Sequence, residues 1–210
     1  YNQISNIDLS QNTALSTLNL SDNDFSSINI TQNTGLEQLS CEDNLLTSLD
    51  VSNNTSLRYF ICGDNQLTNL DISANPALTY LGCHANQLTS LDVSNNTALE
   101  VLSFGKNQLS VIDVSNNTSL NEIRCYENQL IYLDLSSNIN LTKIDLSYNP
   151  LTCLNLKNGF NTNIVVFNSK KNPNLNCIEV DNPSWSTSNW LDVDSNLNFS
   201  TNCSYPAGCF

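Results

Sequence analysis

Leucine and other apolar residues recur along the chain with a period of 21 residues, from residue 15 to residue 161. The unit that begins at Leu78 reads LTYLGCHANQLTSLDVSNNTA. The units on either side begin at Leu57 and Leu99 and read LRYFICGDNQLTNLDISANPA and LEVLSFGKNQLSVIDVSNNTS. A fixed period of this length is typical of a solenoid, in which each unit buries its apolar residues only against its neighbours. The chain is therefore predicted to stack successive coils around one continuous core.

Each unit divides into two similar halves, LxxLxCxxNx and LxxLDVSxNxx. In both halves apolar and polar residues alternate over a short span, which is the period-two signature of a strand with one buried face. Leu81 and Cys83 belong to the buried set of one half, and Leu91 and Val93 to that of the other. An asparagine closes each half, where it turns the chain and bonds backbone groups of the next coil. We predict two parallel sheets, one per half-unit, with asparagine corners and little helix.

The pattern LxxLxLxxN identifies leucine-rich repeats. The nested ten-plus-eleven form, the Cys of LxxLxC and the LDVSxN half resemble those of secreted bacterial leucine-rich-repeat proteins of the Bacteroidetes, from Ile4 to Cys203. The resemblance implies an all-β, right-handed leucine-rich-repeat solenoid with parallel strands and a C-terminal cap. It implies little about the ligand, because this scaffold displays many binding specificities.

The repeats divide the chain into a regular body and two ends. The last recognisable unit is lengthened by two residues, and a half-unit follows it. The tail then loses the period and contains both tryptophans, Trp185 and Trp190, so we expect its aromatic side chains to cover the last coil. The predicted segments are a partial N-terminal repeat at 1–14, repeats of 21 residues at 15–163, a final half-repeat at 164–176, and a C-terminal disulfide cap and tail at 177–210.

The N-terminal half-unit has no amphipathic cap before it. Its apolar residues Ile4, Ile7 and Leu9 are expected to point inward. A solenoid end of this kind presents an open sheet edge, which invites pairing unless it is covered. No signal peptide is visible at Tyr1. We therefore interpret the sequence as a mature chain after cleavage or as a fragment. In the second case, further modules of the larger polypeptide are candidate partners.

Composition narrows the class of partner. The chain has 7 Lys and Arg against 20 Asp and Glu, a formal net charge of −13. Nucleic acid is an unsuitable partner, because its binding depends on cationic contacts to phosphate. No apolar run of 20 residues is present, so no membrane span is expected.

Four of the eight cysteines occupy one inward position of the repeat. Other coils place Leu20, Phe104 and Leu146 in the same position, which favours a packing role. A metal site is the alternative, but stacked coils would give a row of sulfurs rather than a tetrahedron. The predicted buried free thiols are Cys41, Cys62, Cys83 and Cys125.

The other four cysteines lie at or beyond the end of the regular repeats. Cys153 falls on an outward position of the last regular coil, and the rest belong to the tail. The favoured disulfide is Cys177–Cys203, and the second is Cys153–Cys209. Either one would indicate an oxidising, extracytoplasmic setting.

The two halves differ in the residues that they expose. Outward positions of the second half barely vary, with threonine in one column and serine in another, whereas those of the first half vary strongly. This contrast favours recognition by the first-half face, although a solenoid also keeps a face soluble with mixed charges. The candidate ligand-binding residues are Tyr59, Ile61, Tyr80, His84, Lys106, Arg124, Tyr126, Lys143 and Tyr148.

Tyr59 and Tyr80 occupy one column on adjacent coils and should lie about 5 Å apart. Ile61 and Gly82 sit beside them, with His84 at the rim. Exposed tyrosines around a glycine could stack on a sugar ring or anchor a protein loop. The alternative is that two cross-strand tyrosines simply pack on each other and stabilise the sheet.

A second column repeats aspartate at about 5 Å, which requires compensation because stacked like charges repel. Hydrogen bonds from backbone amides and neighbouring hydroxyls would favour the ionised form and are the preferred explanation. Calcium, which takes oxygen ligands, is the alternative. The weak calcium candidates are Asp50, Asp71, Asp92 and Asp113.

Catalysis has little support. His84 is the only histidine, and the repeat places no serine or cysteine nucleophile beside it. Glu100 and Glu122 have a spacing near that of a retaining glycosidase, but they lie on an open face. We predict no enzyme, no cofactor and no metal. The predicted function is non-catalytic recognition of a protein or a polysaccharide, secreted or at a cell surface; the alternative is a rigid spacer or adhesin stalk without a specific ligand.

Overall fold

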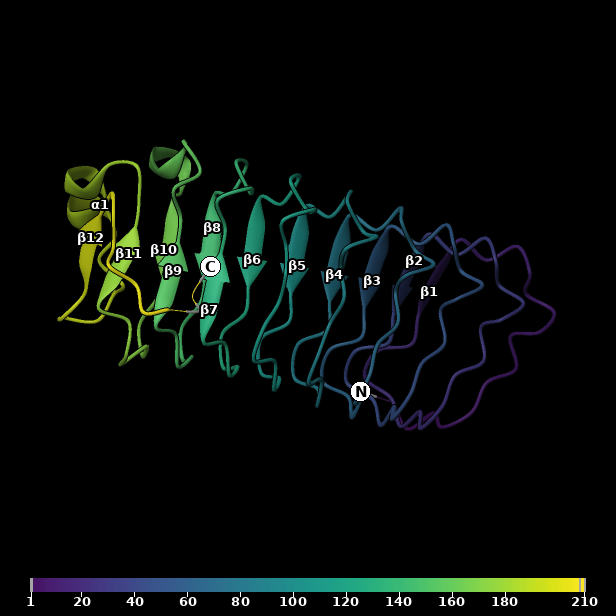
Figure 1. Ribbon diagram of the computed structural model, residues 1–210. Coiled ribbons are helices and arrows are strands. Elements are labelled where there is room, and N and C mark those ends of the chain that lie inside the picture. The colour runs from purple at the N-terminus through teal and green to yellow at the C-terminus, as the bar shows by residue number, and fades with distance from the viewer. Residues whose placement is uncertain (1, 208, 210) are drawn as a thin grey trace.

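The 21-residue pattern folds into stacked coils, which form a parallel β-solenoid in this computed structural model (Figure 1). The structure describes residues 2–207 and 209. Each strand is three residues long, and its middle side chain is buried. Within these described residues, the solenoid is therefore all-β apart from one 3-10 turn, η1 (Asn161–Asn163), and one helix, α1 (Pro183–Asn189).

One parallel sheet contains the first-half strands of eight successive coils, in the order β1-β2-β3-β4-β5-β6-β8-β10. Equivalent residues of neighbouring strands pair, as Tyr59 does with Tyr80. Between the last two strands, the two inserted residues lengthen the connection, so that Lys143 pairs with Val166. The strands are β1 (Thr17–Asn19), β2 (Gln38–Ser40), β3 (Tyr59–Ile61), β4 (Tyr80–Gly82), β5 (Val101–Ser103), β6 (Glu122–Arg124), β8 (Lys143–Asp145) and β10 (Val166–Asn168).

The second sheet is shorter than the sequence predicts. It has four strands in the order β12-β11-β9-β7, namely β7 (Tyr132–Asp134), β9 (Cys153–Asn155), β11 (Cys177–Glu179) and β12 (Asn198–Ser200). Before Tyr132, the described second halves contain no strand. The prediction of a second sheet along the whole body was therefore wrong. Alternating polarity fixes which side chains are buried, but it does not bring neighbouring backbones within ladder distance.

Corner asparagines hold the coils together where the second sheet is absent. The side-chain amide of Asn96 donates to the carbonyls of Ile72 (3.1 Å) and Asn75 (2.9 Å) in the preceding coil. At the other corner, the Asn86 amide donates to the carbonyls of Cys62 (3.0 Å) and Cys83 (3.2 Å). Each corner asparagine thus links two coils, because its side-chain amide donates to a backbone carbonyl of the preceding coil.

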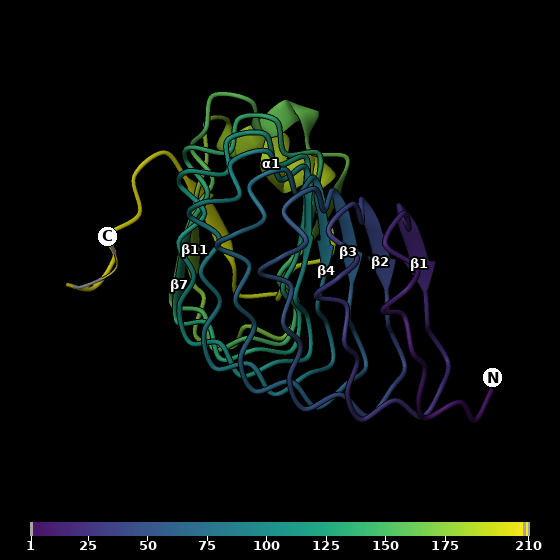
Figure 2. The same cartoon turned by 90° about the vertical axis from the view of Figure 1, so that its right-hand side faces the viewer.

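The N-terminal half-unit is only partly buried. Leu9 packs into the core as expected, but Ile4 and Ile7 are 48% and 40% exposed. These two isoleucines stay exposed because the half-unit has a coil on only one side of it. Figure 2 shows this end as the outermost coil beyond β1.

The C-terminal end is covered by aromatic side chains. Trp190 stacks on Phe167 with 4.3 Å between ring centroids and meets Phe199 edge-on at 5.6 Å. Asn182 caps α1, because its side-chain oxygen accepts from the backbone N–H of Trp185 (3.1 Å). These contacts close the apolar core at this end.

Two disulfides fasten the tail to the solenoid, Cys177–Cys203 and Cys153–Cys209. They are the two pairings expected from the sequence. Cys153 faces away from the core of its own coil, but the tail covers it and leaves it buried. Within the described residues, no helix is long and apolar enough to cross a bilayer.

Candidate functional site

The exposed side of the eight-stranded sheet displays the first and third residues of each strand. The middle residues, such as Phe60 and Leu81, are fully buried. Strict register places the first residues in one column and the third residues in another. The residues just beyond each strand form a third column. The coils turn there at a residue with a left-handed backbone conformation, such as Asp64 (φ 48°) or Lys106 (φ 55°).

Tyr59 and Tyr80 stack in the first column. Their ring centroids are 4.4 Å apart with an interplanar angle of 26°, and Tyr59 is 38% exposed. A Cβ at Gly82 would lie 3.4 Å from the Tyr80 ring and 3.6 Å from Ile61, which is ordinary van der Waals contact with both side chains. Burial raises the pKa of the Tyr80 phenol, which keeps it neutral. The result is a partly exposed apolar surface of two rings and Ile61.

Arg124 and Lys143 lie two and three coils further along the sheet. Both form ion pairs with Glu122, Arg124 through Nη2 to Oε1 and Lys143 through Nζ to Oε2 at 3.2 Å. Glu122 is only 6% exposed, although the sequence placed it among the outward residues. The two cations therefore compensate a buried carboxylate as well as facing solvent. This pairing of the two cations with Glu122 is not evident from the sequence.

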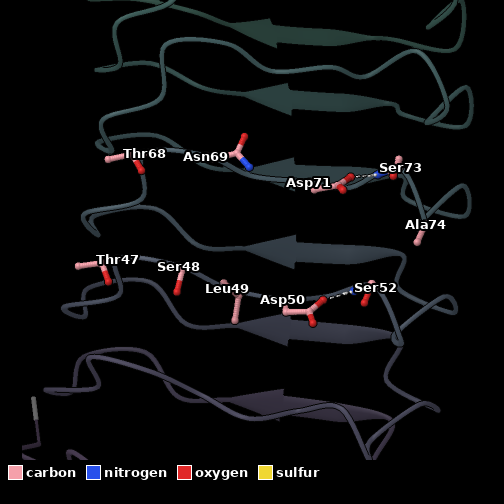
Figure 3. Close-up of a pocket in the computed structure, with 10 residues that line it drawn as sticks. All are labelled: Thr47, Ser48, Leu49, Asp50, Ser52, Thr68, Asn69, Asp71, Ser73 and Ala74. Atoms are coloured by element: carbon pink, nitrogen blue, oxygen red, sulfur yellow. Dashed lines mark hydrogen bonds between the residues drawn. The ribbon is translucent and has the colours of Figure 1, made fainter.

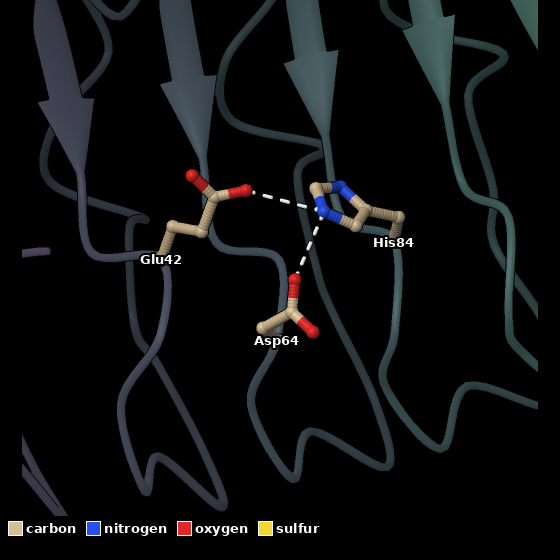
Figure 4. Close-up of side chains that lie close together, drawn as sticks. All are labelled: Glu42, Asp64 and His84. Carbon is tan, nitrogen blue, oxygen red and sulfur yellow. Dashed lines mark ion pairs between the residues drawn. The ribbon is translucent and has the colours of Figure 1, made fainter. Parts of the chain in front are cut away.

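His84 follows β4 and reaches back toward the two preceding coils. Its Nε2 lies 3.1 Å from Glu42 Oε1 and 3.1 Å from Asp64 Oδ2 (Figure 4). The ring passes over Gly63, where a Cβ would meet the imidazole at 2.5 Å. From the sequence, His84 was predicted to lie at the rim of the tyrosine surface, and contacts with Glu42 or Asp64 were not predicted. The sequence pattern that could have indicated the contact with Glu42 is that Glu42 and His84 share a column two periods apart, with glycine between them.

The remaining candidates extend along the same side of the solenoid. Tyr126 crosses Gly105 in the way that His84 crosses Gly63, since a Cβ at Gly105 would collide with the tyrosine ring. Lys106 and Tyr148 project from left-handed turns and are exposed. The structure therefore distributes the sequence candidates along one side of the molecule, and brings Tyr59 and Tyr80 into direct contact.

The aspartate column lies in the second halves of the coils. Asp50 Oδ1 accepts from the backbone N–H of Ser52 (2.9 Å), and Asp71 Oδ1 from that of Ser73 (2.9 Å), at an open hollow between the two coils (Figure 3). Bonds from the serine hydroxyl and the serine N–H lower the pKa of each carboxyl. This is the hydrogen-bond compensation that the pattern of aspartate and serine favours. Among the described residues, the column brings no three carboxylates within ligand distance of one another.

The inward cysteine column contains free, buried thiols at Cys41, Cys62, Cys83 and Cys125. Burial raises the pKa of the Cys41 and Cys83 thiols to about 12. A protonated thiol is a poor nucleophile and a poor metal ligand. These side chains therefore act as small apolar groups in the core.

A model of the LVIVD repeat matches residues 102–128. This is little more than one coil, so the match defines no family for the chain as a whole. No curated protein sequence matches the chain.

Solved structures of bacterial proteins are similar over most of the chain. The functional domain of InlJ from Listeria monocytogenes, which includes a cysteine ladder, is 34% identical over 86% of this chain and 43% of its own, with a TM-score of 0.70. The internalin InlF of Listeria monocytogenes is 29% identical over 69% of this chain and 45% of its own, with a TM-score of 0.65.

A leucine-rich-repeat protein of Leptospira interrogans shares the fold at 19% identity, over 91% of this chain and 57% of its own, with a TM-score of 0.58. The chain spans less than half the length of the two Listeria structures. Together these likenesses and the parallel strands show a leucine-rich-repeat solenoid similar to those of bacterial proteins.

Proposed function

We propose that the chain is a non-catalytic recognition module that binds a protein or a glycan through the exposed side of the eight-stranded sheet. The observation that carries the proposal is the stacked, partly exposed pair Tyr59–Tyr80 beside Ile61. Rigid aromatic side chains lose little conformational entropy on binding and offer a large apolar face. A sugar ring or an apolar loop of a protein fits such a surface.

Charged and aromatic residues continue this surface beyond the tyrosine pair. Lys106 and Tyr148 are exposed on later coils, and Arg124 and Lys143 are each half exposed around Glu122. Internalin-like leucine-rich-repeat domains are typically surface recognition modules, which supports the same role for this chain. The second halves of the coils expose uniform Thr and Ser columns, which offer less basis for specificity.

We further propose an extracytoplasmic setting, secreted or at a cell surface, in a bacterium related to those whose repeats the sequence resembles. Two disulfides support it, because disulfides persist in oxidising compartments. The competing function is a stiff spacer without a specific ligand, which the regular stacking of the coils would serve equally well.

A binding screen against surface proteins and polysaccharides separates these two functions. The wild-type chain is compared with Tyr59→Ala/Tyr80→Ala and with a control, Thr68→Ala/Thr89→Ala, which alters one exposed column on the same two coils away from the sheet face. Recognition by the tyrosine surface predicts binding by wild type and control and a loss of at least tenfold in the tyrosine variant. Binding that is equal in all three would reject this surface, and no binding by a folded wild-type chain would favour the spacer.

A further inference from the structure

His84 is held between two carboxylates that compete for one ring nitrogen. Glu42 Oε1 and Asp64 Oδ2 both lie 3.1 Å from Nε2. An imidazole nitrogen carries at most one proton, so it can give a well-aligned hydrogen bond to only one of the two oxygens. A cation placed among the three atoms would instead be bound by all of them at once.

The spacing of these atoms suits a small divalent ion. Zinc binds imidazole nitrogen and carboxylate oxygen at about 2.0–2.2 Å, so two ligands of a tetrahedral ion lie about 3.4 Å apart. Both nitrogen-to-oxygen distances are close to that value, and all three ligand atoms lie within 4.8 Å of one another. Small rotations of the two carboxylates would complete the geometry.

Gly63 makes this arrangement possible. Glu42 and His84 lie in one column on coils that are two apart, and the intervening residue of that column is Gly63. A Cβ at Gly63 would lie 2.5 Å from Cε1 of His84 and 2.7 Å from Nδ1. Any side chain here would displace the ring, so the glycine positions Nε2 near Glu42.

The surroundings of the cluster are acidic. Burial raises the pKa of the Glu42 carboxyl, and the nearby Asp43, Asp64 and Asp22 raise it further, while His84 opposes them. No described Lys or Arg forms an ion pair with Glu42 or Asp64. The side chains of His84, Glu42 and Asp64 are 26%, 32% and 47% exposed, which leaves the cluster open to an ion from solvent.

We propose that Glu42, Asp64 and His84 form a binding site for a divalent transition-metal ion, with Zn²⁺ as the reference ion. One imidazole with two carboxylates favours zinc-like ions over Ca²⁺ and Mg²⁺, which prefer oxygen ligands alone. Three protein ligands leave a coordination position open on the solvent side. The site goes beyond the proposed recognition function and does not depend on it, since none of its ligands belongs to the Tyr59–Tyr80 surface.

Calorimetric titration of the EDTA-treated, dialysed chain with Zn²⁺ tests the proposal. We expect one ion per chain in the wild type, and at least tenfold weaker binding in His84→Gln and Asp64→Asn. Gly63→Ala should weaken binding to the same degree while keeping all three ligands. The matched control is Gly105→Ala, which crowds Tyr126 in place of His84 and should bind Zn²⁺ like the wild type.

Absorption of the Co²⁺-loaded chain identifies the ligands, because thiolate ligands give a charge-transfer band that nitrogen and oxygen ligands do not. We expect no such band, and thermal unfolding in EDTA verifies that each variant is folded. Absence of Zn²⁺ binding by the wild type would overturn the site. So would undiminished binding in His84→Gln and Gly63→Ala, or a thiolate band that shows the ion at a cysteine.

Discussion

Single buried asparagines at the corners form hydrogen bonds between neighbouring coils. Asn96 is fully buried, and its amide donates to two carbonyls of the preceding coil, those of Ile72 and Asn75. Its neighbour Asn95 is exposed on the same corner. The two residues have the same chemistry, so the difference between them is one of burial and hydrogen bonding alone.

We expect Asn96→Ala to lower the free energy of unfolding by about 1–3 kcal/mol, because it removes two buried hydrogen bonds between coils, each of which contributes about 0.5–1.5 kcal/mol. Asn95→Ala should change it by less than about 0.5 kcal/mol, as exposed substitutions usually do. Urea unfolding followed by far-UV circular dichroism measures both. Equal effects of the two substitutions would show that the corner bonds contribute little.

At the same scale, glycine determines where a ring of the next coil can lie. In the column that follows the strands, Gly63 leaves room for the ring of His84, and Gly105 leaves room for the ring of Tyr126. The sequence shows the pairing of glycine with a ring one period later, but it does not show which way the ring turns. That direction depends on the side-chain rotamer and on the space left by the preceding coil.

At the scale of the element, the end of each second half is a turn built on an aspartate and the serine two residues later. Ser94 N–H donates to Asp92 Oδ1 and Ser115 N–H to Asp113 Oδ1, both at 2.9 Å. An asparagine fills the same role in the first coil, where Thr31 N–H donates to Asn29 Oδ1 (3.2 Å). Aspartate can therefore be replaced by asparagine without loss of the turn.

This element predicts a dependence of stability on pH. Bonds from the serine hydroxyl and N–H lower the pKa of the Asp50, Asp71, Asp92 and Asp113 carboxyls. A lowered pKa in the folded state stabilises the fold above the unfolded pKa of about 3.9. That contribution is lost as the pH falls through the folded value.

The fourfold variant with asparagine at these positions should therefore be less stable than the wild type at pH 6. The difference should shrink as the pH approaches 2. Glu42 and Asp43, whose pKa values burial raises, contribute with the opposite sign but are the same in both proteins. Thermal unfolding between pH 2 and 6 measures the difference, and a gap that is constant with pH would contradict the hydrogen-bond explanation.

The elements also show what a repeat pattern can and cannot predict. The first-half strands and their 21-residue register follow from the alternation of apolar residues, since each coil repeats its neighbour. The second sheet was predicted over the whole body, yet it begins only at Tyr132. The burial of Glu122 and the meeting of Glu42 with His84 depend on long side chains that cross between coils, which the one-dimensional pattern does not specify.

At the scale of the whole molecule, each coil contacts only its neighbours, so stability is close to a sum of coil and interface contributions. The C-terminal coil has a neighbouring coil on one side only, and the aromatic cap covers its other side. Trp190 and Phe199 pack on the exposed end, and Cys177–Cys203 joins β11 to the segment that follows β12. The cap should therefore be the part most sensitive to loss of its disulfide.

Both tryptophans of the chain lie in this cap, so their fluorescence reports on the cap, whereas far-UV circular dichroism reports on all coils. Cys177 and Cys203 are 26 residues apart, for which loop entropy gives a stabilisation of about 3.5 kcal/mol. In Cys177→Ser/Cys203→Ser, the fluorescence transition should move to lower urea than the circular dichroism transition. The control is Cys41→Ser, which removes a free thiol far from the cap. Transitions that still coincide in the double variant would show that the cap and the repeats unfold as one cooperative unit.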